Sequence, residues 1–137
     1  ILEKFAQAEI IPVIAPIGRG DGGETYNINA DTVAGAVAVA LGAAKLIMMT
    51  DVVGLLDQSG VLVPRLSLAQ ARAMLLDGTI DGGMIPKVET CVATVKGATE
   101  AAHILDGRVA HVLLLEIFTA HGVGTMIIDD EVTLGAG

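Results

Sequence analysis

Aromatic side chains are scarce in this sequence, which has no tryptophan, one tyrosine and two phenylalanines among 137 residues. A hydrophobic core must therefore be built from Ala, Val, Leu, Ile and Met, since hydrophobic residues still make up 53% of the chain. Small aliphatic side chains together with 17 glycines allow strands and helices to pack closely. This composition favours an α/β domain over a disordered chain.

Cysteine and positive charge are scarce as well. Cys91 is the only cysteine, which excludes a disulfide framework and a thiolate metal site and makes a cytoplasmic location the default expectation. The net charge of −8 argues against nucleic acid and anionic membranes as partners, because both would be repelled.

No apolar run approaches the roughly 20 residues that a membrane span requires. The mean hydropathy of +0.67 instead predicts apolar surface that meets another domain or subunit.

Apolar runs and turn signals alternate along the chain in the order expected of an α/β fold. Short β-branched runs predict strands at 10–15, 24–28, 45–50, 101–106 and 122–128, with a hairpin at 55–64. Helices are predicted at 2–8, 30–42, 67–78, 87–96 and 112–118. Because strands alternate with helices, we expect a single domain over 1–137 with a mainly parallel sheet covered on both faces.

Glycine-rich and polar segments follow three of the predicted strands, at 18–23, 50–54 and 106–108. Ligands of open α/β sheets bind at the carboxyl ends of the strands, so these loops are candidate binding segments. A further glycine-rich loop, 79–84, precedes a predicted helix whose N-terminus would favour phosphate. The two commonest nucleotide fingerprints, a Walker A motif and a G-x-G-x-x-G turn, are absent.

Three polar side chains, Asn27, Asn29 and Asp31, alternate with apolar residues where the helix at 30–42 begins. Alternate side chains of an extended lead-in point to one side, so the three groups can converge. A helix cap made by Asn29 or Asp31 accounts for one of them. A cap does not account for the other two side chains, so Asp31 is equally well interpreted as an acid that orients another group.

Lys87 is one of few basic residues and lies in the first turn of a predicted helix, after a glycine-rich loop. A cation in the first turn opposes the helix dipole. Two interpretations stay open, a solvated surface lysine and an anion-binding lysine.

His103 lies in an apolar strand, where a histidine is more often a core residue than a ligand, and no metal-ligand spacing joins it to another histidine.

Several segments, in order along the chain, resemble acetylglutamate kinase, a member of the amino-acid-kinase superfamily. They are YNINADTVAG (26–35), LIMMTDVVGLLD (46–57), GGMIPKVE (82–89), HILDGR (103–108), LLEIFT (114–119) and GVGTM (122–126). The resemblance covers 10–127 and implies an open αβα sandwich. It also implies phosphoryl transfer from MgATP to the side-chain carboxylate of N-acetyl-L-glutamate, in arginine biosynthesis.

Residue roles follow from this resemblance. Lys87 would contact the transferring phosphoryl group, Asp31 would orient the catalytic lysines, Asn27 would hold the substrate α-carboxylate and Asn29 would support the site. Mg²⁺ would be held largely by phosphates and water. The residues implied to frame ATP are Thr50, Asp51, Val52, Gly54, Leu55, Thr79, Ile80, Asp81, Gly83 and Met84.

The sequence departs from the family pattern most at its N-terminus. The glycine-rich loop that the family carries in its N-terminal half, a second catalytic lysine and most of the acetylglutamate lid do not occur in it. We therefore expect a C-terminal, ATP-binding lobe that is inactive alone and needs a missing N-terminal domain or a homo-oligomer.

Arginine-inhibited members of the family also carry a similar effector pattern, which implies L-arginine binding at His103, Glu116, Gly122 and Gly124. Two alternatives remain, another amino-acid kinase such as a carbamate or aspartate kinase, and a non-catalytic effector-binding or assembly module. The set Asn27, Asn29 and Asp31, together with the segment before Lys87, disfavours the first of these.

Overall fold

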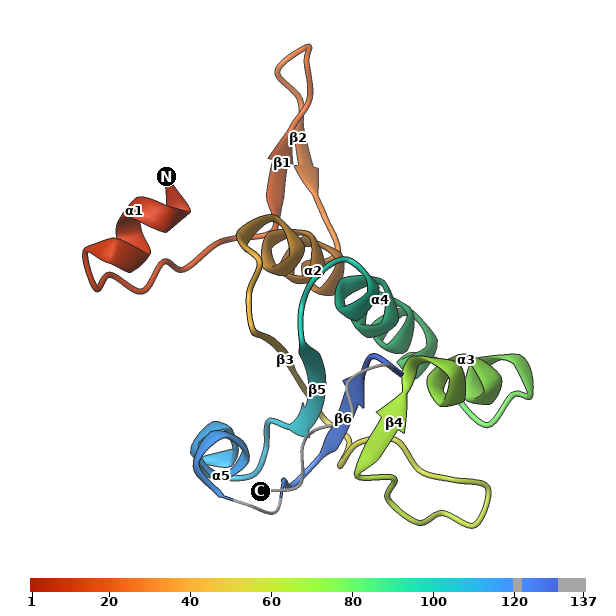
Figure 1. The fold of residues 1–137 in the computed structure, drawn as a ribbon. Helices are drawn as coiled ribbons and strands as arrows, with labels where there is room; N and C mark the ends of the chain where they lie inside the picture. The colour runs from red at the N-terminus through yellow and green to blue at the C-terminus, as the bar shows by residue number, and fades with distance from the viewer. Residues whose placement is uncertain (120–121, 131–137) are drawn as a thin grey trace.

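A four-stranded sheet forms the centre of the computed structural model, which describes residues 1–119 and 122–130 (Figure 1). Its strands, in spatial order, are β3 (Lys45–Thr50), β5 (Ala101–Asp106), β6 (Thr125–Ile128) and β4 (Arg65–Ser67). β3 pairs with β5, and β4 with β6, in parallel, whereas β5 and β6 are antiparallel. The sheet is thus mixed and mostly parallel, and β4 has no counterpart among the predicted strands.

Helices pack on both faces of this sheet. On one face, α2 (Ala30–Leu41), α3 (Leu68–Leu76) and α4 (Met84–Lys96) cover the strands. Ala102 and Ile104 of β5 belong to the core on this side. Because side chains alternate along a strand, His103 points to the opposite face, where it bonds to Glu116 of α5 (Val112–Phe118). The fold is therefore an αβα sandwich, as the sequence predicts.

The ends of the helices follow local signals in the sequence. Asn29 caps α2 by accepting a hydrogen bond from the backbone N–H of Thr32 (3.1 Å). Ser67 and Gln70 form a reciprocal capping box at the start of α3. α4 begins at Met84 rather than at the predicted residue 87 and ends before Gly97. Pro86 fits there, because the first turn of a helix needs no backbone N–H from it.

The prediction of a strand at 10–15 is wrong. The structure has α1 (Leu2–Gln7), then an extended segment without strand pairing, and then a hairpin of β1 (Ile17–Arg19) and β2 (Thr25–Asn27). The β-branched residues of 10–15 suit a strand, but no strand lies beside them in the part of the chain that the structure describes. Ile11 and Val13 are consequently 89% and 96% exposed.

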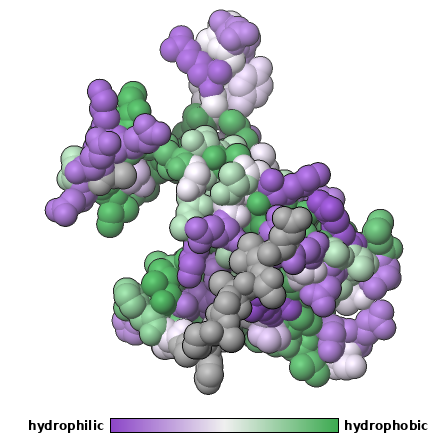
Figure 2. Space-filling view, viewed as in Figure 1, coloured by the Kyte–Doolittle hydropathy of each residue, from purple (hydrophilic) through white to green (hydrophobic). Residues whose placement is uncertain are grey.

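The loop at 18–23 is therefore also placed differently from the prediction. Instead of following a strand of the main sheet, it forms the end of the β1–β2 hairpin, which projects away from the sheet (Figure 1). Hydrophobic side chains gather on the extended segment between α1 and this hairpin (Figure 2). This is exposed apolar surface of the kind that the hydropathy predicts.

Gly124 must be glycine for β6 to lie beside β5, because a Cβ there would overlap the carbonyl oxygen of Ile104. We expect Gly124→Ala to lower the free energy of unfolding by at least ~2 kcal/mol, since overpacking forces the backbone to move. Gly83→Ala is the matched control, because nothing lies within 4 Å of its added Cβ. Thermal denaturation of both variants measures the difference, and equal melting temperatures would contradict this packing.

Candidate functional site

Asp31 and Lys87 meet although they are 56 residues apart in the sequence. The Nζ atom of Lys87 lies 2.8 Å from Oδ2 of Asp31, and the two side chains are 23% and 26% exposed. Asp31 is in the first turn of α2, and Lys87 is at the start of α4. The structure thus joins the two residues predicted to be catalytic into one ion pair that solvent can reach.

α2 and α4 run side by side in the same direction. Asp31 contacts Lys87, Gly35 lies against Thr90, and Val39 lies against Gly97 at the far ends. The N-termini of both helices therefore lie at the same edge of the molecule, together with the Lys87 ammonium group. Helix N-termini carry partial positive charge, so this edge favours an anion.

Among the three alternating polar residues, the side chains of Asn29 and Asp31 have different partners. The Oδ1 atom of Asn29 caps α2, which settles the open choice of cap in favour of Asn29. Asp31 is paired with Lys87. Asn27 is the last residue of β2, where it pairs with Ile17 in the ladder. Only Asn29 therefore acts as the helix cap, and Asp31 forms an ion pair instead.

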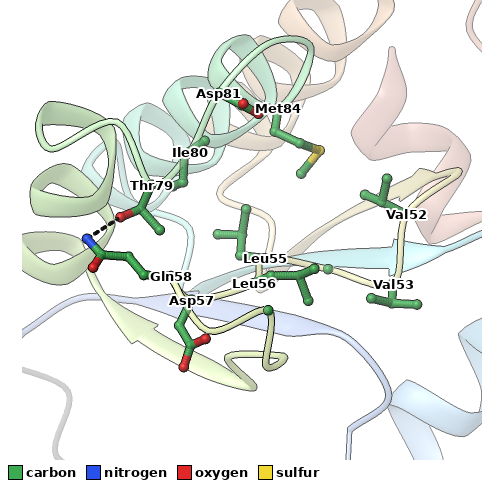
Figure 3. Close-up of a pocket in the computed structure, with 12 residues that line it drawn as sticks. Val52, Val53, Leu55, Leu56, Asp57, Gln58, Thr79, Ile80, Asp81 and Met84 are labelled. Carbon is green, nitrogen blue, oxygen red and sulfur yellow. Dashed lines mark hydrogen bonds between the residues drawn. The ribbon is translucent and has the colours of Figure 1, made fainter.

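A pocket of about 370 Å³ lies between the segment after β3 and the loop before α4 (Figure 3). Seven residues of the predicted nucleotide set line it: Val52, Gly54, Leu55, Thr79, Ile80, Asp81 and Met84. Thr50, the last residue of β3, is not part of its lining, and neither are Asp51 and Gly83 of the two segments. Since Met84 is the first residue of α4, the pocket opens beside the helix that carries Lys87.

Five further lining residues lie outside the predicted set, namely Val53, Leu56, Asp57, Gln58 and Gly60. The amide Nε2 of Gln58 donates to Oγ1 of Thr79 (3.3 Å) and so links the two walls of the pocket. The carboxylate of Asp57 accepts hydrogen bonds from the backbone of Ser59 and Val61. The sequence identifies this stretch as a turn, but it carries no signal that the turn would fold over the loop at 79–84.

A second charged group lies where β3 and β5 end. Arg108 donates from Nε and Nη2 to the two carboxylate oxygens of Asp106, at 2.9 and 2.8 Å. The side-chain hydrogen bonds from Arg108, followed by its backbone N–H, lower the pKa of Asp106 to about 2. Beside this pair, the N–H of Gly107 donates to the carbonyl of Thr50, and the hydroxyl of Thr50 donates to Asp51 (3.3 Å). The pair therefore holds the turn after β5, and the bond from Gly107 joins this turn to the end of β3.

Cys91 is not available as a nucleophile. It is fully buried, and burial, followed by the charge of Asp31, raises the pKa of its thiol to about 12. A thiol with this pKa stays protonated at neutral pH, and only the thiolate is reactive. Cys91 is therefore a residue of the hydrophobic core.

The four residues of the predicted effector set lie together on the α5 side of the sheet. Nδ1 of His103 is 2.6 Å from Oε1 of Glu116, and both side chains are buried. The other carboxylate oxygen of Glu116 accepts from the backbone N–H of Val123, between Gly122 and Gly124. In the described part of the chain, Nε2 of His103 is buried without a hydrogen-bond partner.

Comparison with known proteins identifies the class. The model of the amino acid kinase family matches residues 1–106, so the chain belongs to the amino acid kinase family. It is 58% identical over 127 residues to the acetylglutamate kinase of Parvibaculum lavamentivorans and 56% identical over 128 residues to that of Rhizobium etli. These matches cover 93% of this chain but 42% and 43% of those proteins. The chain thus spans less than half the length of the curated relatives it matches.

Solved structures agree with this assignment. A structure of N-acetylglutamate synthase from Neisseria gonorrhoeae, complexed with coenzyme A and L-arginine, matches with a TM-score of 0.89 and 30% identity. The match covers 94% of this chain and 30% of that one. A Giardia carbamate kinase is similar in fold, with a TM-score of 0.74 and 21% identity over 94% of this chain and 46% of that one.

Two kinds of feature do not occur among the described residues. None of their helices combines the length and the apolar character that crossing a membrane would need. The same residues contain no group of three or more His, Cys, Asp or Glu side chains placed to hold a metal ion.

The lowered pKa of Asp106 makes a prediction about stability and pH. A folded-state pKa of about 2, below the ordinary 3.8, contributes stability that is fully present above the ordinary value and is lost as the pH falls through about 2. Asp106→Asn should therefore be less stable than the wild type near neutral pH, and this difference should shrink between pH 4 and 2. Urea unfolding across this range measures it.

Asp21→Asn is the control for this series, because Asp21 lies at the exposed end of the β1–β2 hairpin. It should change stability little at any pH. A difference between Asp106→Asn and the wild type that stays constant down to pH 2 would contradict the pairing with Arg108.

Proposed function

We propose that residues 1–137 form the nucleotide-binding part of an acetylglutamate kinase, which phosphorylates the side-chain carboxylate of N-acetyl-L-glutamate with MgATP. The observation that carries this proposal is the Asp31–Lys87 ion pair at the adjacent N-termini of α2 and α4, beside the pocket. The identity of 56–58% with acetylglutamate kinases supports the choice of substrate.

The chemistry of phosphoryl transfer explains why such a pair is useful. The transferring group carries negative charge that must be neutralised and held in line, and positioned positive groups do both. Lys87 would contact this group, assisted by the helix N-termini beside it. Asp31, 2.8 Å from the ammonium group, would hold Lys87 in the orientation that transfer requires.

The pocket supports ATP as the cofactor. A volume of about 370 Å³ lies within the ordinary range of ligand sites, roughly 300–1,000 Å³. The apolar residues of its lining suit a base, and its edge at Met84 leads to the start of α4, where phosphates would lie. Mg²⁺ would be coordinated mainly by phosphates and water.

The acetylated substrate would lie near the start of α2. Asn27 would bind its α-carboxylate from the end of β2. Asn29 uses its carbonyl oxygen as the helix cap, and its amide N–H groups remain suited to donate to a carboxylate. Asn29 is two residues and Asn27 four residues before Asp31, so a substrate held by them would be close to the Asp31–Lys87 pair.

The chain is proposed to be inactive alone. The glycine-rich loop and second catalytic lysine implied by the family resemblance do not occur within residues 1–137, and the longer relatives extend over more than twice the matched length. A further domain or another copy would complete the site, with the exposed apolar segment at 10–15 as surface for it. As an enzyme of arginine biosynthesis, the protein would act in the cytoplasm.

Lys87→Ala tests the nucleotide site. The variant should bind MgATP about tenfold more weakly than the wild type, because a charge-assisted hydrogen bond to phosphate contributes on the order of 1.5–3 kcal/mol. Lys96→Ala, in the last turn of the same helix, is the matched control and should bind as the wild type does. Isothermal titration calorimetry gives the three dissociation constants, and equal affinities for Lys87→Ala and the wild type would refute the role of Lys87.

We further propose that L-arginine binds near His103, Glu116 and Gly122–Gly124. The clustering of these residues favours this ligand, and so does the likeness to the Neisseria synthase, whose structure is a complex with coenzyme A and L-arginine. A carboxylate and backbone carbonyls suit a guanidinium group and an α-ammonium group. Arginine binding without any ATP binding would favour the alternative, an effector-binding or assembly module.

Glu116→Gln tests the effector site. It removes the charge of the carboxylate while keeping a similar shape, so arginine affinity should fall about tenfold or more. MgATP affinity measured on the same variant is the internal control and should stay within twofold. Unchanged arginine affinity would exclude Glu116 from the site.

A further inference from the structure

Thr125 is a buried residue whose hydroxyl bridges two segments distant in sequence. It is the first residue of β6 and is 0% exposed. Its Oγ1 accepts a hydrogen bond from the backbone N–H of Leu55 (2.8 Å) and donates one to the carbonyl of Val63 (2.7 Å). Leu55 lines the pocket, and Val63 closes the hairpin that begins there.

The hydroxyl occupies the place of a missing ladder bond. Across the hairpin, Val63 donates its N–H to the carbonyl of Leu55 (2.8 Å), and the adjoining bridge pairs Leu56 with Leu62. In a regular antiparallel ladder, the N–H of Leu55 would return the bond to the carbonyl of Val63. The hydroxyl of Thr125 lies between these two groups and forms a hydrogen bond with each of them. These bonds attach the base of the hairpin to β6.

Gly54 allows this insertion. Its φ is +139°, in the region that favours glycine. A Cβ at Gly54 would lie 2.7 Å from Oγ1 of Thr125 and 3.2 Å from its backbone nitrogen. The pocket wall therefore lies close to β6 at Thr125.

We propose that Thr125 is a positioning residue for the nucleotide pocket, whose hydroxyl fixes the wall formed by Gly54 and the hairpin at 55–63. Thr125 does not line the pocket and acts through Leu55. A threonine serves here because its hydroxyl donates one hydrogen bond and accepts another at the same time. The choice of MgATP as the ligand rests on the function proposed above.

The experiment compares Thr125→Val, which keeps the shape and removes the hydroxyl, with Thr125→Ser, which keeps the hydroxyl. Thr125→Val leaves the buried N–H of Leu55 and carbonyl of Val63 without partners, so MgATP should bind about tenfold more weakly. Thr125→Ser should stay within about threefold of the wild type. Thr99→Val is the matched control, because Thr99 is also buried, beyond the far end of α4, and its hydroxyl has no partner among the described residues.

Amide hydrogen exchange provides a readout that does not depend on nucleotide. The Leu55 amide should exchange at least tenfold faster in Thr125→Val than in Thr125→Ser, the wild type or Thr99→Val. The amide of Ile104, in the centre of β5, should be unaffected. If the wild type does not bind MgATP, the proposed function fails, and the exchange of Leu55 still decides whether Thr125 holds the wall.

Two results would overturn the proposal. The first is wild-type affinity and wild-type Leu55 exchange in Thr125→Val. The second is global unfolding of both Thr125→Val and Thr125→Ala while Thr99→Val remains folded, because the hydroxyl would then support the whole domain rather than one wall of the pocket.

Discussion

The close, parallel packing of α2 on α4 determines where the charged groups of the candidate site lie. It requires glycine at two contacts: a Cβ on Gly35 would lie 2.7 Å from a threonine methyl group of α4, and a Cβ on Gly97 would lie 2.9 Å from a valine methyl group of α2. Because both helices run in the same direction, their N-termini meet at one edge. The Asp31–Lys87 pair and the positive ends of two helix dipoles are consequences of this packing.

Two strands also end at the edge where the N-termini of α2 and α4 lie. β3 and β5 end there, at Thr50 and Asp106, and the bidentate Asp106–Arg108 pair keeps the following turn in place. In β6, the buried hydroxyl of Thr125 holds the pocket wall through Leu55 and Val63. Two residues before Thr125, the N–H of Val123 donates a hydrogen bond to Glu116. The candidate effector cluster and the candidate nucleotide pocket are thus attached to neighbouring residues of one chain segment.

Much of this arrangement is predictable from the sequence, for identifiable reasons. The boundaries of α2 and α3 follow from Asn29, Gly42 and Ser67, whose side chains or backbone freedom act locally. The strands β3 and β5 follow from short apolar runs. The two segments that form most of the pocket could be predicted because glycine-rich loops lie next to strand and helix ends.

Other features depend on contacts that no local pattern records. The segment at 10–15 has the composition of a strand, but a strand also needs a neighbour, and none of the described residues provides one. The pairing of Asp31 with Lys87 depends on how two helices pack, and the role of Thr125 depends on a hairpin about 60–70 residues earlier in the chain. A threonine in an apolar strand gives no sign of which backbone groups it will bond.

We infer that the pocket and the start of α4 together bind a nucleotide. An NMR titration of the ¹⁵N-labelled chain with MgATP tests this claim residue by residue. We expect the largest amide shift changes at 52–58, at 79–84 and around Lys87, with little change in the β1–β2 hairpin or in α5. The absence of saturable shifts, or shifts confined to α5 and the segment at 10–15, would contradict the account.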